Sequence, residues 1–350
     1  GIITKNIMNN YSLSNNYGNL KKIINNVLQK EETVMRNTFL KFVTLLAFGF
    51  STLLSGNALA HDNKQYTIGF AAANLQADFF NFIKESVEAE TARLGHKSIV
   101  VDSGGDDAKQ VSQIEDLLVK QIDALVLIIS GNTDGNAQIR KAKEAGIPVI
   151  TVDRNTTNPP GDSFIASDSE VAAYEMGMWV AEKTGGKGIV GVIQGQLGST
   201  PEIARDTGFE NAIAQFPDLN TVEKQASKMW SRDEGVSIAQ DLLTRNPEIT
   251  VLFGRCDALA QGAAQAAKAM GRDDVLVVGF DGDRAALQDL KNNNTLLAAT
   301  MTQQTLTIGR NAVRFAIDAI EGRYIPSEML YGSTLTTPEN VDQFMGDGHP

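Results

Sequence analysis

A regular alternation of short apolar runs and helical patterns is the feature that most limits the folds open to this 350-residue chain. Runs rich in Val and Ile and bounded by turn residues predict strands at Tyr66–Ala72, Ser98–Asp102, Ala124–Ile129 and Pro148–Asp153. Helical patterns that begin with an Asp suited to N-capping separate them, at Asp78–Gly95, Asp107–Gln121 and Asp134–Gly146. Apolar strands joined by helices are typical of a parallel sheet covered on both faces.

The same alternation occurs again in the second half of the chain. Strands are predicted at Ile189–Ile193, Thr221–Ala226, Val251–Gly254 and Val275–Asp281. Helices are predicted at Pro201–Phe216, Ser231–Asn246, Asp257–Gly271 and Arg284–Asn293. A later strand, Leu297–Thr302, and helix, Leu306–Gly322, are expected to return to the first domain. The sequence therefore predicts an α/β protein with two doubly wound parallel-sheet domains.

Both halves contain a buried strand that ends in an aspartate, Val149–Asp153 in the first and Val277–Asp281 in the second. Ligands of open α/β sheets bind beyond the carboxyl ends of the strands. Two such domains joined by crossings of the chain would turn these ends toward each other. We therefore expect Asp153 and Asp281 to face one cleft.

A segment ahead of the alternation, residues 35–60, has the three parts of a secretion signal. Arg36 and Lys41 make a basic start, and Phe42–Leu54 is an apolar run of 13 residues. This run is too short to span a bilayer, which takes about 20 residues. Ala58–Ala60 matches the pattern of small residues at a cleavage site. We interpret residues 35–60 as a signal peptide, so the mature protein is expected in the periplasm.

The mature chain is expected to begin at His61, without a Cys to carry a lipid anchor. Residues 1–34 are rich in Asn, Ile and Lys, which AT-rich codons specify, and codons for Lys30–Glu32 would contain a ribosome-binding sequence. We therefore expect residues 1–34 to be a translated leader and Met35 to be the true start.

Composition excludes several classes of protein. The chain has a net charge of −11, which argues against nucleic acid as the main partner. Its single Cys excludes an internal disulfide framework and a Cys-based zinc site, and its three His leave little for His-dependent catalysis. We expect no metal and no cofactor.

Four segments in the mature region resemble periplasmic sugar-binding proteins of the ribose-binding type, which are the substrate-capturing subunits of ABC importers. They are Tyr66–Phe70, Phe79–Phe80, Pro148–Arg154 and Val278–Gly282. The resemblance extends from about Tyr66 to about Val341 and implies a type I periplasmic binding protein. Such a protein has two domains, joined by a three-strand hinge, that close over a monosaccharide.

The resemblance also implies domain limits and partners. One lobe would comprise residues 65–166 and 303–331, and the other residues 167–302 and 332–345. The protein would be a monomer that binds a small sugar and docks on an ABC permease of the inner membrane, with a chemoreceptor as a possible further partner. It would not be an enzyme.

Sugars present paired hydroxyl groups and an apolar ring face, so carboxylates, planar donors and aromatic rings suit them. By resemblance, Asp153, Arg154, Asp281 and Gln303 would bind the hydroxyl groups. The alternative for Asp153 and Arg154 is a surface ion pair, worth at most about 1 kcal/mol. Asn74 is a further candidate contact.

Aromatic residues would cover the faces of the sugar ring. By resemblance, Phe79 and Phe80 stack on one face and Trp230 on the other. Core packing is the alternative for the two phenylalanines, because many aromatic residues near the start of a helix serve that purpose.

Three positions depart from the ribose-binding pattern. Ala77 and Cys256 replace asparagines that contact the ligand, and Ile203 replaces an arginine, whose role we assign to Arg205. Cys256 offers only weak hydrogen bonding and is either a buried structural residue or part of a reshaped pocket. The ligand therefore stays open among pentoses, hexoses, polyols and furanosyl signal molecules of the autoinducer-2 type.

Two other functions fit the sequence less well. The chain has no GxGxxG turn after its first strand and no GxSxG, HExxH or Walker motif, so an exported carbohydrate-active enzyme is the weaker alternative. A sugar-responsive repressor would need a basic helix-turn-helix in place of the signal peptide.

Overall fold

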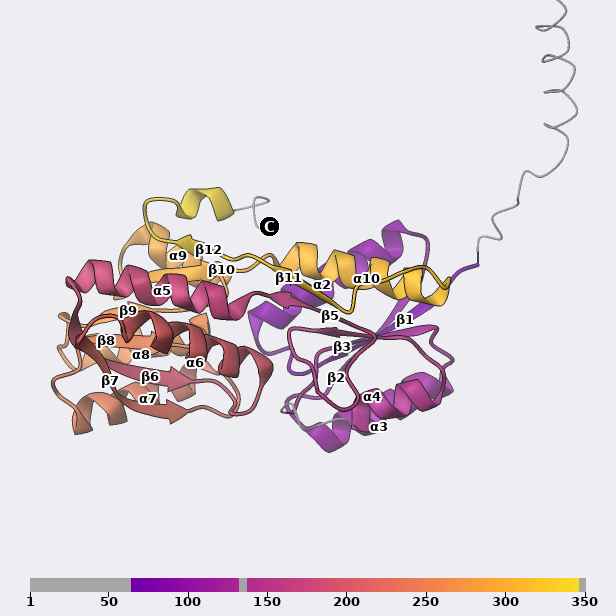
Figure 1. The fold of residues 1–350 in the computed structure, drawn as a ribbon, viewed down its shortest axis with the longest axis horizontal. Coiled ribbons are helices and arrows are strands. Elements are labelled where there is room, and N and C mark those ends of the chain that lie inside the picture. The colour runs from indigo at the N-terminus through magenta and orange to yellow at the C-terminus, as the bar shows by residue number, and fades with distance from the viewer. Residues whose placement is uncertain (1–63, 132–136, 346–350) are drawn as a thin grey trace, which may run out of the picture. The chain divides into compact units, whose positions relative to one another are not determined.

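The computed structural model describes residues 64–131 and 137–345 (Figure 1). The expected leader, residues 1–34, and signal peptide, residues 35–60, lie outside the described residues. All elements below belong to one compact unit, Gln65–Pro350, whose described part contains two six-stranded sheets.

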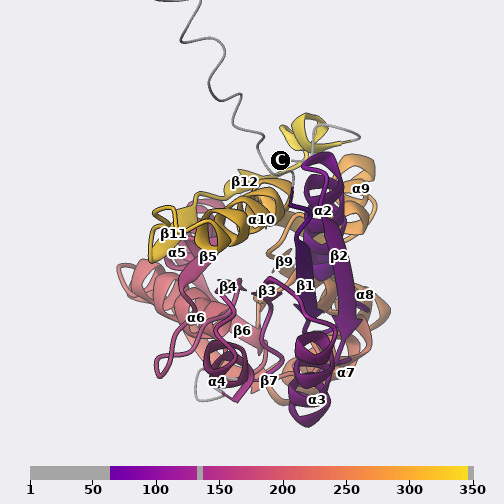
Figure 2. The same ribbon diagram turned by 90° about the vertical axis from the view of Figure 1, so that its right-hand side faces the viewer.

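The first sheet has the strand order β11-β5-β4-β3-β1-β2, and every neighbouring pair is parallel. Its strands are β1 (Thr67–Ala72), β2 (Lys97–Asp102), β3 (Ala124–Leu127), β4 (Val149–Val152), β5 (Ser163–Ser167) and β11 (Glu328–Tyr331). Four helices cover it: α2 (Asp78–Arg93), α3 (Asp107–Val119), α4 (Ala137–Glu144) and α10 (Thr305–Ile320). One core forms under α2 and α10 and a second under α3 and α4, so both faces are covered, as predicted (Figure 2).

The second sheet has the order β12-β10-β9-β8-β6-β7. Its strands are β6 (Lys187–Gln194), β7 (Asp218–Ala226), β8 (Val251–Gly254), β9 (Leu276–Val278), β10 (Leu297–Thr302) and β12 (Thr334–Thr336). Helices α5 (Ser169–Thr184) and α6 (Thr200–Ile213) pack on one face, and α7 (Arg232–Arg245), α8 (Asp257–Ala269) and α9 (Arg284–Asn292) on the other. A 3₁₀ turn, Val341–Phe344, packs near α9.

One expectation about chain tracing was wrong. The strand β10 pairs in parallel with β9 and antiparallel with β12, so it belongs to the second sheet and does not return to the first. A strand, a helix and a parallel strand form a compact β9-α9-β10 unit, which is the usual continuation of such a sheet. Only the following helix, α10, returns, and it packs against α2.

The chain passes between the two sheets three times, as predicted for a three-strand hinge. The crossings lie between β5 and α5, between β10 and α10, and between β11 and β12. Each of them is only a few residues long. They bring the carboxyl ends of β4 and β9 to opposite sides of one cavity.

Candidate ligand-binding site

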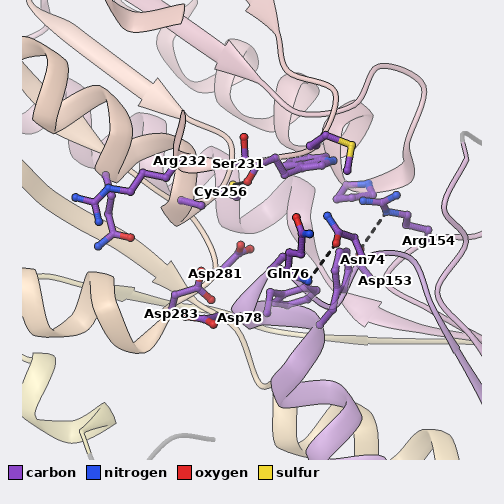
Figure 3. Close-up of a pocket in the computed structure, with 18 of the residues that line it drawn as sticks. Asn74, Gln76, Asp78, Asp153, Arg154, Ser231, Arg232, Cys256, Asp281 and Asp283 are labelled. Carbon is purple, nitrogen blue, oxygen red and sulfur yellow. Dashed lines mark hydrogen bonds and ion pairs between the residues drawn. The ribbon is translucent and has the colours of Figure 1, made fainter. Parts of the chain in front are cut away.

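A cavity of about 270 Å³ lies between the carboxyl ends of strands from the two sheets. This is close to the lower end of the range for small-molecule pockets, about 300–1,000 Å³. The first-sheet side contributes the loop before α2 and the residues after β4, and the second-sheet side contributes the helix starts that follow β6, β7, β8 and β9. Of the predicted site residues, those on the wall are Asn74, Phe79, Phe80, Asp153, Arg154, Arg205, Trp230, Cys256 and Asp281 (Figure 3).

Asp153 comes directly after β4 and is held in a left-handed conformation with φ 62°. Its backbone N–H donates to Ile165 O of the neighbouring strand at 2.9 Å. The carboxylate is buried and lies 3.6 Å from Arg154 Nε. Burial raises the pKa of Asp153, and the charges of Arg154 and Arg205 oppose the rise. A non-glycine residue held in this conformation is uncommon and occurs preferentially at functional sites.

Asp281 occupies the matching place after β9, also with a positive φ, 130°. Its Oδ1 accepts hydrogen bonds from Gln303 Nε2 at 2.7 Å and from Arg205 Nη2 at 3.3 Å. Burial raises the pKa of Asp281 well above its usual range, Arg205 opposes this, and the charges of other carboxyls, including Asp153, add to it. The two aspartates therefore line one cavity from two sheets, as the sequence predicted.

Gln303 lies behind Asp281 and is not on the cavity wall. It is fully buried, and besides the side-chain bond its backbone N–H donates to Asp281 O at 2.9 Å. The crossing after β10 thus places its amide against the aspartate, in a position to orient the carboxylate.

Aromatic rings enter the cavity from both sides. Phe79 and Phe80, in the first turn of α2, meet edge to face with ring centroids 5.4 Å apart. Trp230, just before α7, comes from the second-sheet side. The Arg154 guanidinium carbon is 5.4 Å from the Phe80 ring centroid and 5.8 Å from that of Trp230, so it lies between aromatic groups of the two sides.

Arg205 points into the cavity from α6, whereas Ile203 of the same helix is half exposed. Arg205 Nη1 donates to Arg255 O at 2.5 Å, and the Arg205 guanidinium carbon lies 3.8 Å from the Phe280 ring centroid. Arg255 Nη1 donates in return to Arg205 O at 2.9 Å. These contacts fix the guanidinium beside Asp281.

Cys256 stands at the cap of α8 and is buried, and its thiol donates to Trp230 O at 3.5 Å. Burial and the nearby charge of Asp281 raise the pKa of the thiol well above its usual value. Cys256 therefore stays a neutral, small lining group. Ala77 also lines the cavity, so both positions that lack an asparagine face the ligand space.

Several wall residues were not predicted as site residues, chiefly Gln76, Asp78, Arg232, Gln261 and Asp283. Asp78 directly precedes Phe79, and Asp283 comes two residues after Asp281. The closeness of Asp78 and Asp283 to predicted site residues could have indicated that they line the site. Acidic residues at the start of a helix are, however, common because they stabilise the helix.

No group of His, Cys, Asp and Glu suited to a metal ion occurs within residues 64–131 and 137–345. In the same described ranges, none of the helices has the length and apolar character needed to cross a membrane.

Comparison with known proteins shows that the chain is similar to periplasmic binding proteins. Residues 68–323 match the family described as a periplasmic binding protein domain. The chain is 33% identical over 291 residues to the ribose import binding protein of Escherichia coli, an alignment that covers 82% of this chain and 95% of that protein. It is 32% identical over 264 residues to the Bacillus subtilis ribose import binding protein, covering 75% and 85%. It is 28% identical over 270 residues to a xylitol-binding protein of Mycolicibacterium smegmatis, covering 76% of each.

Solved structures of ABC transporter solute-binding proteins are also similar to the chain. An ABC transporter solute-binding protein of Mycobacterium smegmatis with bound glycerol superposes with a TM-score of 0.77 at 27% identity, covering 82% of this chain and 99% of that one. One from Bacillus halodurans with bound myo-inositol has a TM-score of 0.75 at 27% identity, with coverage of 81% and 99%.

Proposed function

The chain belongs to the periplasmic binding protein family, and we propose that it captures a monosaccharide or polyol for an ABC importer. The observation that carries the proposal is the shared cavity, where Asp153 and Asp281 meet from two different sheets. The comparison proteins support it, because they are named for ribose and xylitol or hold glycerol and myo-inositol.

The chemistry of the wall suits a ligand rich in hydroxyl groups. The carboxylates of Asp153 and Asp281 can accept hydrogen bonds from hydroxyls, while Arg154, Arg205 and the Trp230 indole can donate. Nε of both arginines and Nε1 of Trp230 are buried and make no hydrogen bond to another described residue, although Arg154 Nε lies 3.6 Å from the Asp153 carboxylate. Because an unpaired buried polar group costs about 1–3 kcal/mol, a ligand that pairs with these atoms is favoured over one that does not.

The hinge supplies the motion for capture and release. We assign residues 65–166 and 303–331 to one lobe and residues 167–302 and 332–345 to the other. Rotation about the three crossings would open the cavity to solvent, and closure would remove water and strengthen the polar contacts.

The proposal places the protein in the periplasm as a monomer without catalytic activity. The closed, ligand-bound form would dock on the permease of its importer, and a chemoreceptor is a further candidate partner. The signal peptide expected at residues 35–60 supports this location.

A thermal-unfolding screen of the purified protein with pentoses, hexoses, polyols and furanosyl signal molecules tests the proposal. A ligand present at 100 times its dissociation constant adds about 2.7 kcal/mol to stability, which raises the melting temperature by several degrees. Asp153→Ala and Asp281→Ala should abolish this rise, whereas the matched control Asp273→Ala, at an exposed aspartate outside the cavity, should keep it. A panel in which no carbohydrate stabilises the wild-type protein contradicts the proposal.

A further inference from the structure

One carboxyl group on the cavity wall has a buried oxygen without a hydrogen-bond partner among the described residues. Asp283 is 7% exposed, and its Oδ1 makes no hydrogen bond within the described part of the chain. It stands at the N-cap position of α9 but does not cap the helix with its side chain. Its backbone N–H donates to Asp257 Oδ2 at 2.8 Å, which fixes the backbone at this position while the carboxyl group borders the cavity.

The surroundings of Asp283 are acidic. Burial, followed by the charges of Asp281, Asp257 and Asp78, raises the pKa of Asp283 well above its usual range, and Arg205 opposes the rise. Asp153 and Asp281 each have an arginine within 4 Å, at 3.6 Å and 3.3 Å. Within residues 64–131 and 137–345, no ion pair of this kind is found for Asp283 or Asp78.

The cavity extends past Asp281 toward this acidic group. Figure 3 shows Asp153 and Arg154 on one side of the cavity, Asp283 and Asp78 on the other, and Asp281 between them. The wall also includes the small side chains Cys256 and Ala258. Asp283 and Asp78 thus lie away from Asp153 and Arg154, where a group attached to a sugar ring beside Asp153 would extend.

In either protonation state the Asp283 carboxyl group has an oxygen that can accept a hydrogen bond, so a donor on the ligand can pair with it. A buried acceptor left unpaired costs about 1–3 kcal/mol, and more when it is charged. A hydroxyl or a protonated amine would supply the donor, whereas a ligand that ends short of Asp283 would leave the carboxyl group unpaired.

We propose that Asp283, with Asp78 beside it from the first lobe, determines ligand length by accepting a hydrogen bond from a donor on an exocyclic or terminal sixth carbon. The inference rests on the proposed function and narrows the ligand to six-carbon sugars and sugar alcohols, or their amino derivatives, over five-carbon ones.

Calorimetric titration with matched pairs tests this. The pairs are D-allose with D-ribose, D-glucitol with xylitol, and 6-amino-6-deoxy-D-glucose with D-glucose. The wild-type protein should bind the six-carbon member of at least one of the first two pairs at least tenfold more tightly than its five-carbon partner. Asp283→Ala should lower that affinity by tenfold or more and change the affinity for the five-carbon partner by less than threefold.

Asp283→Asn identifies the donor on the ligand. The amide oxygen still accepts from a hydroxyl, so a hydroxyl ligand should lose less affinity than with alanine. A protonated amine keeps an acceptor in the amide oxygen but loses its charge partner, so the amino sugar should lose more affinity with Asp283→Asn than the hydroxyl sugar does. Asp273→Asn, at an exposed aspartate outside the cavity, is the matched control and should bind like the wild type.

The results separate the two proposals. If the wild-type protein binds no sugar, the proposed function is wrong. If it binds sugars but favours the five-carbon members, or if Asp283→Ala weakens both members of the allose–ribose and glucitol–xylitol pairs equally or weakens neither, the role of Asp283 is refuted while the proposed function stands.

Discussion

Replacing Gly195 with alanine is expected to displace the Trp230 ring and weaken sugar binding, because glycine leaves room for the indole. A Cβ at position 195 would lie 1.8 Å from Trp230 Cη2, 2.1 Å from Cζ2 and 2.2 Å from Cζ3. The backbone at Gly195 does not have a positive φ, so alanine is tolerated there apart from this contact. Its N–H donates to Glu202 Oε2 at 2.8 Å, a bond that the substitution leaves in place.

The magnitude follows from the geometry. Ordinary van der Waals contact begins near 3.4 Å, so the indole must move by about 1.6 Å from its present place. Overpacking of this kind costs about 1–3 kcal/mol. Because Trp230 borders the cavity, the ring can relieve the contact by swinging into the ligand space, and the ligand must then drive it back. The dissociation constant should therefore rise about five- to 150-fold.

A double-mutant cycle measures whether the effect acts through the tryptophan. Phenylalanine lacks the three indole atoms that meet the new methyl group, so Gly195→Ala made on a Trp230→Phe background should change affinity less than twofold. The coupling free energy is then at least about 0.5 kcal/mol. Asp273→Ala, at an exposed aspartate outside the cavity, serves as the control. Wild-type affinity and unchanged tryptophan emission in Gly195→Ala would refute the reasoning.

Three further predictions concern stability, reactivity and closure. The Glu90 carboxylate accepts a hydrogen bond of 2.7 Å from Arg93, which lowers the pKa of Glu90 from 4.5 to about 2. Glu90→Gln should therefore lower the free energy of unfolding, measured in urea at pH 7, by about 1–2 kcal/mol. The difference in stability between the wild type and Glu90→Gln should narrow as the pH falls from about 4.5 toward 2. A difference that stays constant over this range would contradict the prediction. Cys256, the single cysteine, should react slowly with Ellman's reagent at pH 8 and more slowly with sugar bound; fast labelling insensitive to sugar would contradict its burial. Asn155 N donates to Thr200 Oγ1 at 3.0 Å across the cleft. Thr200→Val should therefore favour an open form, with a larger radius of gyration in solution scattering and weaker sugar binding. An unchanged radius would show that this bond does not stabilise the closed form.

The strands that the sequence predicts are mostly those in which Val and Ile make a continuous buried run, whereas the buried strand Ser163–Ser167, with a serine at each end, was missed. Strands such as Val149–Val152 are fully buried, and the aspartates that end them are recognisable from their place alone. Edge strands such as Glu328–Tyr331 and Thr334–Thr336 were missed, because they are short and half exposed and so lack an apolar run. Helix Ser169–Thr184 was missed although its buried residues recur at helical spacing.

The sequence also predicts some residues of the site and not others. Asp153, Asp281 and Trp230 were predicted from strand ends and resemblance, and the structure places them on one cavity. Gln303 was also expected on the wall, yet it lies behind Asp281, since the direction of a side chain at a crossing is set by the neighbouring sheet. The position of Asp283 depends on how α9 starts relative to α2, which no local pattern specifies.

A crystal structure of the protein grown with the sugar that gives the largest thermal stabilisation tests the central claim most directly. We expect one sugar in the cavity, with hydroxyl groups within hydrogen-bonding distance of both the Asp153 and Asp281 carboxylates and with the ring beside Trp230. A sugar bound elsewhere, or one that contacts only one of the two carboxylates in the closed form, would contradict it.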